Sequence, residues 1–224
     1  MTDPSKLDTA EIRTWPELRD TLRRPFATTL RVDAAALSHT GKVRTNNEDH
    51  YFVARVGRSM HTVLTNLPEG DIPARFDTAG YTMVVADGMG GAAAGEIASR
   101  MAISTLINMV LDVPDWIMKL DDANAPRVME RVAQYYQRVD RALAAHAQKD
   151  PSLTGMGTTM TVAYSVDTDL FIAHVGDSRL YLFRDGGLKQ LTRDHTQAQM
   201  MIDAGLLQRD EVATSRLKHV LTNI

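Results

Sequence analysis

The hydrophobic period changes along this chain, and the change limits the folds that are open to it. Over residues 94–111 and 126–149, apolar side chains recur every three or four positions, as on one face of a helix. From Thr158 they recur at every second position, as in strands with one buried face. Because helices are grouped with helices and strands with strands, we expect an α+β fold with antiparallel sheets.

Strands are predicted on both sides of the two helices. An apolar, β-branched run from Tyr81 to Ala86 is typical of a buried strand. The other expected strands are residues 34–37, 49–53, 158–166, 170–175, 179–183 and 188–191. Residues 57–79 contain several Gly and Pro without periodicity and predict a long loop. A short helix is expected over residues 196–204.

Residues 1–30 are expected to form a leader that is distinct from a domain comprising residues 31–224. Thr14 and Glu17 have the spacing of a capping box, and Leu18 and Leu22 lie one helical turn apart. The favoured interpretation is one short helix packed on the body of the protein, and a helix that binds a partner is the alternative.

Composition excludes several classes of function. The net charge is only −3, so no strong field attracts nucleic acid or an anionic membrane. No apolar run has the length of a membrane span, and the first thirty residues hold no signal-peptide core. The chain has no cysteine, which excludes disulfides and thiolate metal sites. We expect a cytoplasmic protein that binds neither nucleic acid nor membrane.

Asp87 and Gly88 place two oxygen ligands directly after the expected strand at 81–86. The Asp87 carboxylate and the Gly88 carbonyl, which no side chain shields, suit Mg²⁺ or Mn²⁺ with water completing the octahedron. Asp-Gly is also a common turn sequence, so this pair alone leaves both interpretations open.

Three further acidic segments, residues 44–49, 176–179 and 192–195, adjoin apolar strands. Several acidic strand ends suggest one end of a sheet lined with carboxylates. Such carboxylates repel one another and resist ionisation unless a cation neutralises them. The pattern therefore predicts a divalent metal site.

Five ordered motifs resemble those of the PP2C-type, metal-dependent serine/threonine phosphatases, and the bacterial branch is the more similar. They are Arg44-x-x-Asn47-Glu48-Asp49, Asp87-Gly88-Met89-Gly90-Gly91, Gly155-Met156-Gly157-Thr158-Thr159, Gly176-Asp177-Ser178-Arg179 and Leu191-Thr192-x-Asp194-His195. The resemblance covers about residues 32–224. It implies an antiparallel β-sandwich flanked by helix pairs, with two Mn²⁺ or Mg²⁺ ions at one end.

The resemblance also implies roles for the acidic residues. Asp87 resembles the carboxylate that bridges both metals, and Gly88 supplies its carbonyl to one of them. Glu48 resembles a direct or water-mediated ligand of that same metal, and Asp49 an acceptor that holds metal-bound water. Asp177 matches the acid that holds a third, weaker metal in bacterial members.

The remaining motif residues are expected to bind substrate or to support the fold. Arg44 resembles the phosphate clamp, since a planar guanidinium suits two phosphate oxygens. Arg179 and Asp194 are expected to pair structurally. His195 is a candidate substrate contact, with capping or packing as the alternative. Met89 stands where eukaryotic relatives often carry a histidine that is a candidate acid, so the leaving group would depend on metal-bound water or on a group such as His50.

The implied activity is hydrolysis of phosphoserine and phosphothreonine in proteins by water activated between two metals. The implied partners are phosphorylated proteins, including a Ser/Thr kinase. The family continues past the segment resembling His219–Thr222 with an Asp-Gly and an Asp-Asn pair that complete the first metal site. We therefore expect a truncated domain without its last strands, monomeric but with an edge that can pair.

Two other interpretations compete with this one. A catalytically impaired module that binds phosphoproteins or regulates a partner is the alternative function. A dinucleotide-binding loop at Gly88-x-Gly90-x-x-Ala93 is disfavoured for two reasons. Asp87 would face the pyrophosphate with like charge. The acidic residue expected about twenty positions later should end a second strand, whereas Asp112 ends a helical pattern.

Overall fold

The computed structural model describes residues 32–90, 94–112, 125–166, 169–208 and 210–223. The chain divides into two compact units, one of residues 1–30 and 58–78 and the other of residues 31–57 and 79–224. The predicted leader helix lies outside the described residues, and the predicted domain boundary stays a prediction.

Five strands form one antiparallel sheet. Its strands are β1 (Asp49–His61), β2 (Arg75–Met89), β3 (Gly157–Thr158), β4 (Met160–Val166) and β5 (Asp169–Val175). The order is β1-β2-β4-β5, and β3 pairs with the end of β2. Val84 lies opposite Val162 in the pairing of β2 with β4, and Gly88 lies opposite Thr158 in the pairing of β2 with β3. This register places the Asp87-Gly88 pair beside the Thr158-Thr159 pair.

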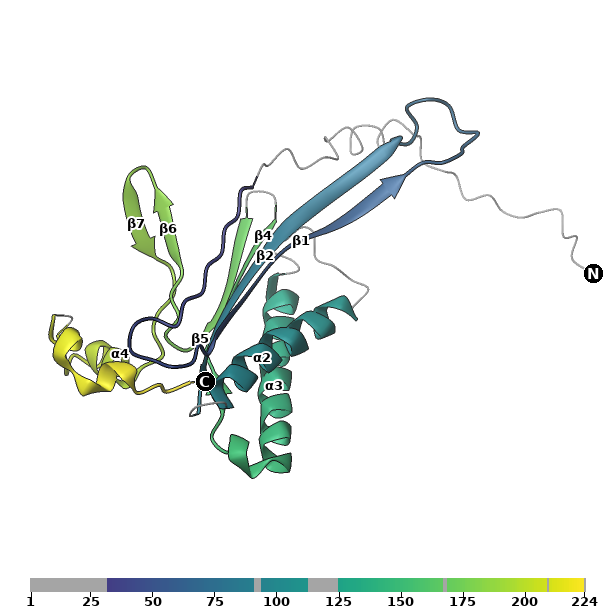
Figure 1. Cartoon of the computed structure of the whole chain (residues 1–224). Helices are drawn as coiled ribbons and strands as arrows, with labels where there is room; N and C mark the ends of the chain where they lie inside the picture. Colours follow the sequence, from purple (N-terminus) through teal and green to yellow (C-terminus); the bar gives the residue numbers. More distant parts are fainter. Residues whose placement is uncertain (1–31, 91–93, 113–124, 167–168, 209, 224) are drawn as a thin grey trace, which may run out of the picture. The chain divides into compact units, whose positions relative to one another are not determined.

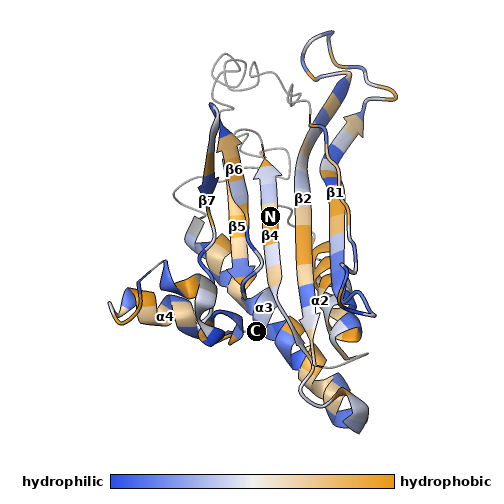
Figure 2. Cartoon of the chain, turned by 60° about the vertical axis from the view of Figure 1, so that its left-hand side comes forward, coloured by the Kyte–Doolittle hydropathy of each residue, from blue (hydrophilic) through white to orange (hydrophobic). Residues whose placement is uncertain are grey.

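Two long helices cover one face of this sheet, as Figures 1 and 2 show. They are α2 (Ala94–Leu111) and α3 (Ala125–Lys149). The core beneath them joins sheet and helix residues and comprises Val84, Ala86, Met160, Ala98, Ala102, Ile103, Leu106, Val139 and Leu143. None of the described helices is both long enough and apolar enough to cross a bilayer.

The remaining described elements lie outside this sheet. The strands β6 (Tyr181–Arg184) and β7 (Gly187–Gln190) form a separate two-stranded sheet. Their turn places Asp185 and Gly186 at positive φ, 52° and 76°, as two-residue hairpin turns require. The helix α4 (Gln197–Asp203) is capped by Thr196, and the 3₁₀ helices η1 (Pro151–Leu153), η2 (Glu211–Thr214) and η3 (Arg216–His219) complete the described elements.

The α+β class and the two long helices are confirmed. The helix predicted over 196–204 is α4 with its two cap residues, and the predicted strand 81–86 lies within β2. The last two predicted strands are β6 and β7 with bounds shifted by one or two residues. The expected sandwich has a second sheet flanked by its own helix pair. In the described parts of the chain, the second sheet consists of β6 and β7 alone, and no second pair of long helices flanks it.

Three predictions about the strands were wrong. Residues 34–37 form no strand, because alanine has low β-propensity and Leu37 stays 90% exposed without a partner strand among the described residues. The loop predicted over 57–79 is shorter, since β1 runs to His61 and β2 begins at Arg75. The strands continue there through residues that show no hydrophobic alternation, exposed in β1 and half-buried at Phe76, Asp77 and Thr78 of β2. The predicted strand 158–166 is interrupted at Thr159.

Candidate active site

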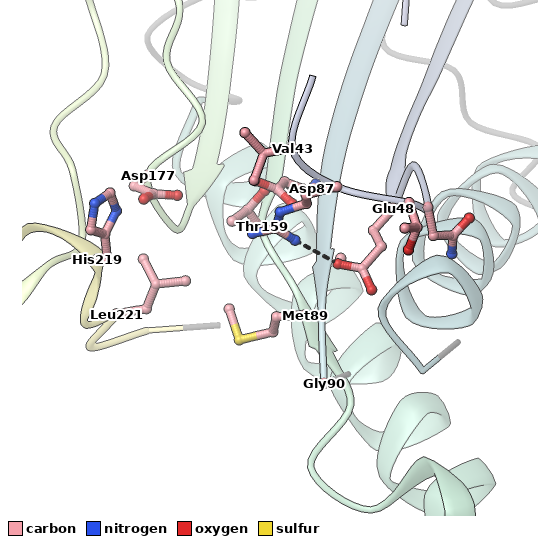
Figure 3. A pocket seen from close by; sticks show the side chains of 13 residues that line it. Val43, Glu48, Asp87, Met89, Gly90, Thr159, Asp177, His219 and Leu221 are labelled. Carbon is pink, nitrogen blue, oxygen red and sulfur yellow. Dashed lines mark hydrogen bonds and ion pairs between the residues drawn. The ribbon is translucent and has the colours of Figure 1, made fainter. Parts of the chain in front are cut away.

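A hollow of about 610 Å³ opens at the end of β2. The side chains that carry charge or can donate hydrogen bonds there come from separate segments of the chain, and they are Arg44, Thr45, Asn46, Glu48, Asp87, Thr159, Asp177 and His219. Figure 3 shows Asp87 and Thr159 between Glu48 on one side and Asp177 with His219 on the other. The structure therefore brings together four of the acidic or basic residues predicted for the site.

The backbone of Asp87 is fixed by the two threonines beside it. Its N–H donates to Thr159 Oγ1 at 3.0 Å, and its carbonyl accepts from Thr159 N at 2.9 Å and from Thr158 Oγ1 at 3.0 Å. The end of β2 thus cannot shift relative to β3 without breaking three hydrogen bonds.

Gly88 sits where β2 meets the start of α2. A Cβ atom at Gly88 would lie 1.9 Å from the carbonyl oxygen of Gly95, a distance that no side chain can adopt. Gly88 N–H also donates to the carbonyl oxygen of Glu48 at 3.2 Å. The glycine therefore lets the Asp87 segment, the first turn of α2 and the start of β1 meet.

The charges around Asp87 disfavour its ionisation. Burial, and then the charges of Asp49 and Asp177 and a hydrogen bond from Asp49, raise the pKa of Asp87 from 3.8 to about 6, while Arg44 acts in the opposite direction. Asp49 does not line the hollow, yet its carboxyl group contacts that of Asp87. These carboxylates lie close enough to repel one another, which is the condition that a bound cation relieves.

Arg44 and Glu48 are paired with each other. Arg44 Nη1 lies 2.9 Å from Glu48 Oε2, and the interaction is drawn as a dashed line in Figure 3. The Arg44 side chain is 71% exposed, whereas that of Glu48 is only 9% exposed and packs against Gly95. Arg44 is thus anchored at one nitrogen while most of its guanidinium faces solvent.

The donor set suits cations that keep much of their water. Within the described residues, no group of three or more His, Asp or Glu side chains converges tightly enough to enclose an ion. Separate carboxylates and backbone oxygens around an open hollow instead match Mg²⁺ or Mn²⁺, which bind through one or two carboxylates and several waters. The residues fit hydrated divalent ions better than a structural zinc site.

Asp177 lies in the loop between β5 and β6 and lines the hollow. The preceding Gly176 has a φ of +100°, and a Cβ there would lie 2.5 Å from Thr159 Cβ. His195 holds the same loop, because its ring Nδ1 accepts from Gly176 N at 3.3 Å and its backbone N–H donates to Gly176 O at 2.8 Å.

His195 does not line the hollow, and its ring packs 5.0 Å from that of His174. This position supports the packing alternative, and a contact with substrate stays a prediction. Arg179 and Asp194 pair structurally as predicted, with Arg179 Nε 2.9 Å from Asp194 Oδ1.

Sequence reasoning assigned no role to Thr159 or His219, although both line the hollow. Thr159 stands in one of the recognised motifs, so its position next to the acidic residues was the available signal. His219 opens the segment His219–Thr222 that resembles one of the family, but its place in the hollow depends on how the chain folds after α4. His50 turns away from the hollow, since its Nδ1 lies 2.9 Å from Ser99 Oγ in α2.

Comparison with known proteins gives a consistent answer. The family profile described as protein phosphatase 2C matches residues 65–220, more than half of the chain. The serine/threonine protein phosphatase PstP of Mycobacterium tuberculosis is 36% identical over 185 residues, and protein phosphatase PhpP of Streptococcus pneumoniae is 32% identical over 193. The solved structure of a serine/threonine phosphatase from S. agalactiae superposes with a TM-score of 0.61 at 26% identity and covers 84% of this chain.

The matched region is only part of each relative. The alignment with PstP includes 82% of this chain but 29% of PstP, and that with PhpP includes 85% of this chain and 66% of PhpP. The S. agalactiae structure is likewise covered to 66% of its length. On the extent of the profile match and the identity to these phosphatases, the chain belongs to the protein phosphatase 2C family.

Proposed function

We propose that this protein hydrolyses phosphoserine and phosphothreonine in proteins with the help of divalent metal ions. The observation that carries the proposal is the meeting of Glu48, Asp87 and Asp177 around one hollow that also receives Arg44. The naming of PstP and PhpP as protein phosphatases supports it.

The metal ions would be held by the Asp87 carboxylate and the Gly88 carbonyl, with Glu48 and Asp49 acting directly or through water, and Asp177 at a weaker position. Two Mn²⁺ or Mg²⁺ ions would supply an activated water and neutralise charge on the phosphate. The raised pKa of Asp87 supports this assignment, because a cation would relieve the repulsion that raises it.

Arg44 would bind the phosphate of the substrate. Its guanidinium is largely exposed at the mouth of the hollow, and the salt bridge with Glu48 fixes its direction. A planar guanidinium can donate to two phosphate oxygens at once. Arg44 would therefore orient the phosphate and stabilise its charge as the ester bond breaks.

The leaving oxygen of serine or threonine needs a proton, and Met89 has none to give. Among the described residues that line the hollow, His219 is the only histidine. We assign the proton transfer to His219 rather than to His50, whose ring faces Ser99.

The substrates would be phosphorylated proteins, a Ser/Thr kinase among them. A monomer in the cytoplasm remains our expectation for the molecule that acts on them.

Hydrolysis of para-nitrophenyl phosphate and of a phosphothreonine peptide tests the proposal. Turnover should require Mn²⁺ or Mg²⁺, stop with a chelator and fall at least about a hundredfold in Asp87→Asn. Asp140→Asn is the matched control, because Asp140 is exposed on α3. Turnover that is unaffected by both the chelator and Asp87→Asn would contradict the proposal.

A regulatory module that binds phosphoproteins without hydrolysing them is the second candidate. The family profile and the named relatives favour hydrolysis over this alternative. Saturable binding of the phosphothreonine peptide, with no phosphate released in the presence of Mn²⁺, would select this function over hydrolysis.

A further inference from the structure

Two buried hydroxyl groups lie between the acidic segments of the candidate active site. Ser99 is 0% exposed and Thr159 is 1% exposed. Buried hydroxyls are costly unless they are hydrogen-bonded, and both are bonded to more than one segment of the chain. Each one can therefore fix the distance between the segments that it joins.

Thr159 joins the Asp87 segment to the loop that carries Asp177. Its Oγ1 accepts from Asp87 N at 3.0 Å and lies 2.7 Å from Ser178 Oγ, next to Asp177. Gly176 packs against the same side chain so closely that a Cβ would lie 2.5 Å from Thr159 Cγ2. One side chain thus contacts the backbone of Asp87 and both sequence neighbours of Asp177, another predicted metal ligand.

Ser99 joins the Glu48 segment to the first turns of α2. Its Oγ lies 2.6 Å from the carbonyl oxygen of Glu48 and 3.1 Å from that of Gly95. The Glu48 carbonyl also accepts from Gly88 N, and His50 Nδ1 lies 2.9 Å from Ser99 Oγ. Ser99 therefore holds the peptide of Glu48 at the place where it meets the Asp87-Gly88 pair.

We propose that Ser99 and Thr159 are positioning residues that set the spacing of the Glu48, Asp87 and Asp177 segments for divalent metal binding. The inference rests on the proposed metal-dependent function. Neither hydroxyl needs to touch a metal ion. Each acts by hydrogen-bonding the backbone or a neighbour of a ligand, and losing such a partner typically lowers metal affinity by about 10- to 100-fold.

Metal binding measured directly, without turnover, tests this role. Titration calorimetry with MnCl₂ on the full chain should give a dissociation constant about 10- to 100-fold higher for Ser99→Ala and for Thr159→Val than for the parent. Thr159→Ser keeps the hydroxyl and should restore the parent affinity. The rise in melting temperature on adding Mn²⁺ should shrink in the same variants, since that rise follows the affinity.

Two control variants separate positioning from a general loss of stability. Tyr136→Phe removes a half-buried hydroxyl, which donates to the Met160 carbonyl oxygen at 3.2 Å. Ser104→Ala removes an exposed serine on α2 whose hydroxyl donates to Met101 O within the same helix. Both controls should keep the parent affinity for Mn²⁺, even where Tyr136→Phe lowers the melting temperature.

Parent-like affinity for Mn²⁺ in both Ser99→Ala and Thr159→Val would overturn this inference but not the proposed function. So would an equal loss of affinity in Tyr136→Phe. A parent chain that binds no divalent ion would overturn the proposed function together with the inference. Circular dichroism establishes that each variant is folded. If Thr159→Val does not fold, Ser99→Ala decides the outcome, because each hydroxyl is expected to act separately.

Discussion

The guanidinium of Arg44 lies 2.9 Å from the carboxylate of Glu48, so the predicted phosphate clamp and a predicted metal ligand are bonded to each other. The pair links the two tasks of the site. A phosphate that binds to Arg44 meets a guanidinium whose orientation is already fixed by Glu48, a predicted metal ligand. Positioning of this kind lowers the entropic cost of binding.

Replacing Arg44 by lysine should weaken phosphate binding more than it disturbs the fold. Lysine keeps the charge but loses the planar fork, so we expect kcat/KM for a phosphothreonine peptide to fall by about 10- to 100-fold. Steady-state kinetics with Arg44→Lys and Arg44→Ala measure this, and Arg141→Lys on the exposed side of α3 is the control. Parent kinetics in Arg44→Ala would remove Arg44 from the site.

The pKa of Asp87 makes the stability of the metal-free protein depend on pH. Its pKa is raised from 3.8 to about 6 by burial and by the charges of Asp49 and Asp177. The folded state therefore holds a proton that the unfolded state loses, and this stabilisation is lost as the pH rises from about 4 through 6. Urea denaturation without metal should give a lower free energy of unfolding at pH 7 than at pH 5.

Asp87→Asn removes this titration and Asp140→Asn does not. Between pH 5 and pH 7, the free energy of unfolding should therefore decrease less in Asp87→Asn than in the parent. Saturating Mn²⁺ should stabilise the parent more at pH 7 than at pH 5, since the ion binds the ionised carboxylate. Equal pH dependence in the parent and in Asp87→Asn would show that Asp87 does not carry the effect.

His219 should matter only when the leaving group needs a proton. In His219→Gln we expect turnover of a phosphothreonine peptide to fall by about 10²- to 10⁴-fold, the range typical of a lost general acid. Turnover of para-nitrophenyl phosphate should stay near the parent value, because nitrophenolate leaves without a proton. Comparison of the two substrates measures the effect, and equal losses on both would assign His219 a structural role instead.

The sequence predicts the acidic residues of the site better than the contacts that hold them in place. Glu48, Asp87 and Asp177 are recognisable because charge next to an apolar strand contradicts the local pattern. Their gathering was predictable from the antiparallel order of the strands. The pairing of Arg44 with Glu48 was not, because it depends on where the chain before β1 runs after it is folded.

The limits of prediction in the fold have a similar origin. The helices α2 and α3 were predictable because their apolar period is long and uninterrupted. The outer parts of β1 and β2 were not, because their residues show no hydrophobic alternation while the backbone pairing continues. The break at Thr159 follows from its hydrogen bonds to Asp87, a residue 72 positions earlier, and no local pattern reports it.

Gly88→Ala should disturb the site through packing alone. The added methyl would lie 1.9 Å from Gly95 O and 2.3 Å from Gly95 C, so β2 and the start of α2 must separate. Forced overpacking typically costs about 1–3 kcal/mol, and this contact with rigid backbone belongs at or above the upper end. Denaturation should show that loss, and calorimetry should show weaker Mn²⁺ binding, because the Gly88 carbonyl moves with the strand.

Gly187→Ala is the matched control, since a Cβ there would lie 3.5 Å from Arg184 O, an ordinary contact. This variant should leave metal affinity unchanged. A Gly88→Ala variant with parent stability and parent affinity for Mn²⁺ would show that the approach of β2 to α2 is not needed for the site.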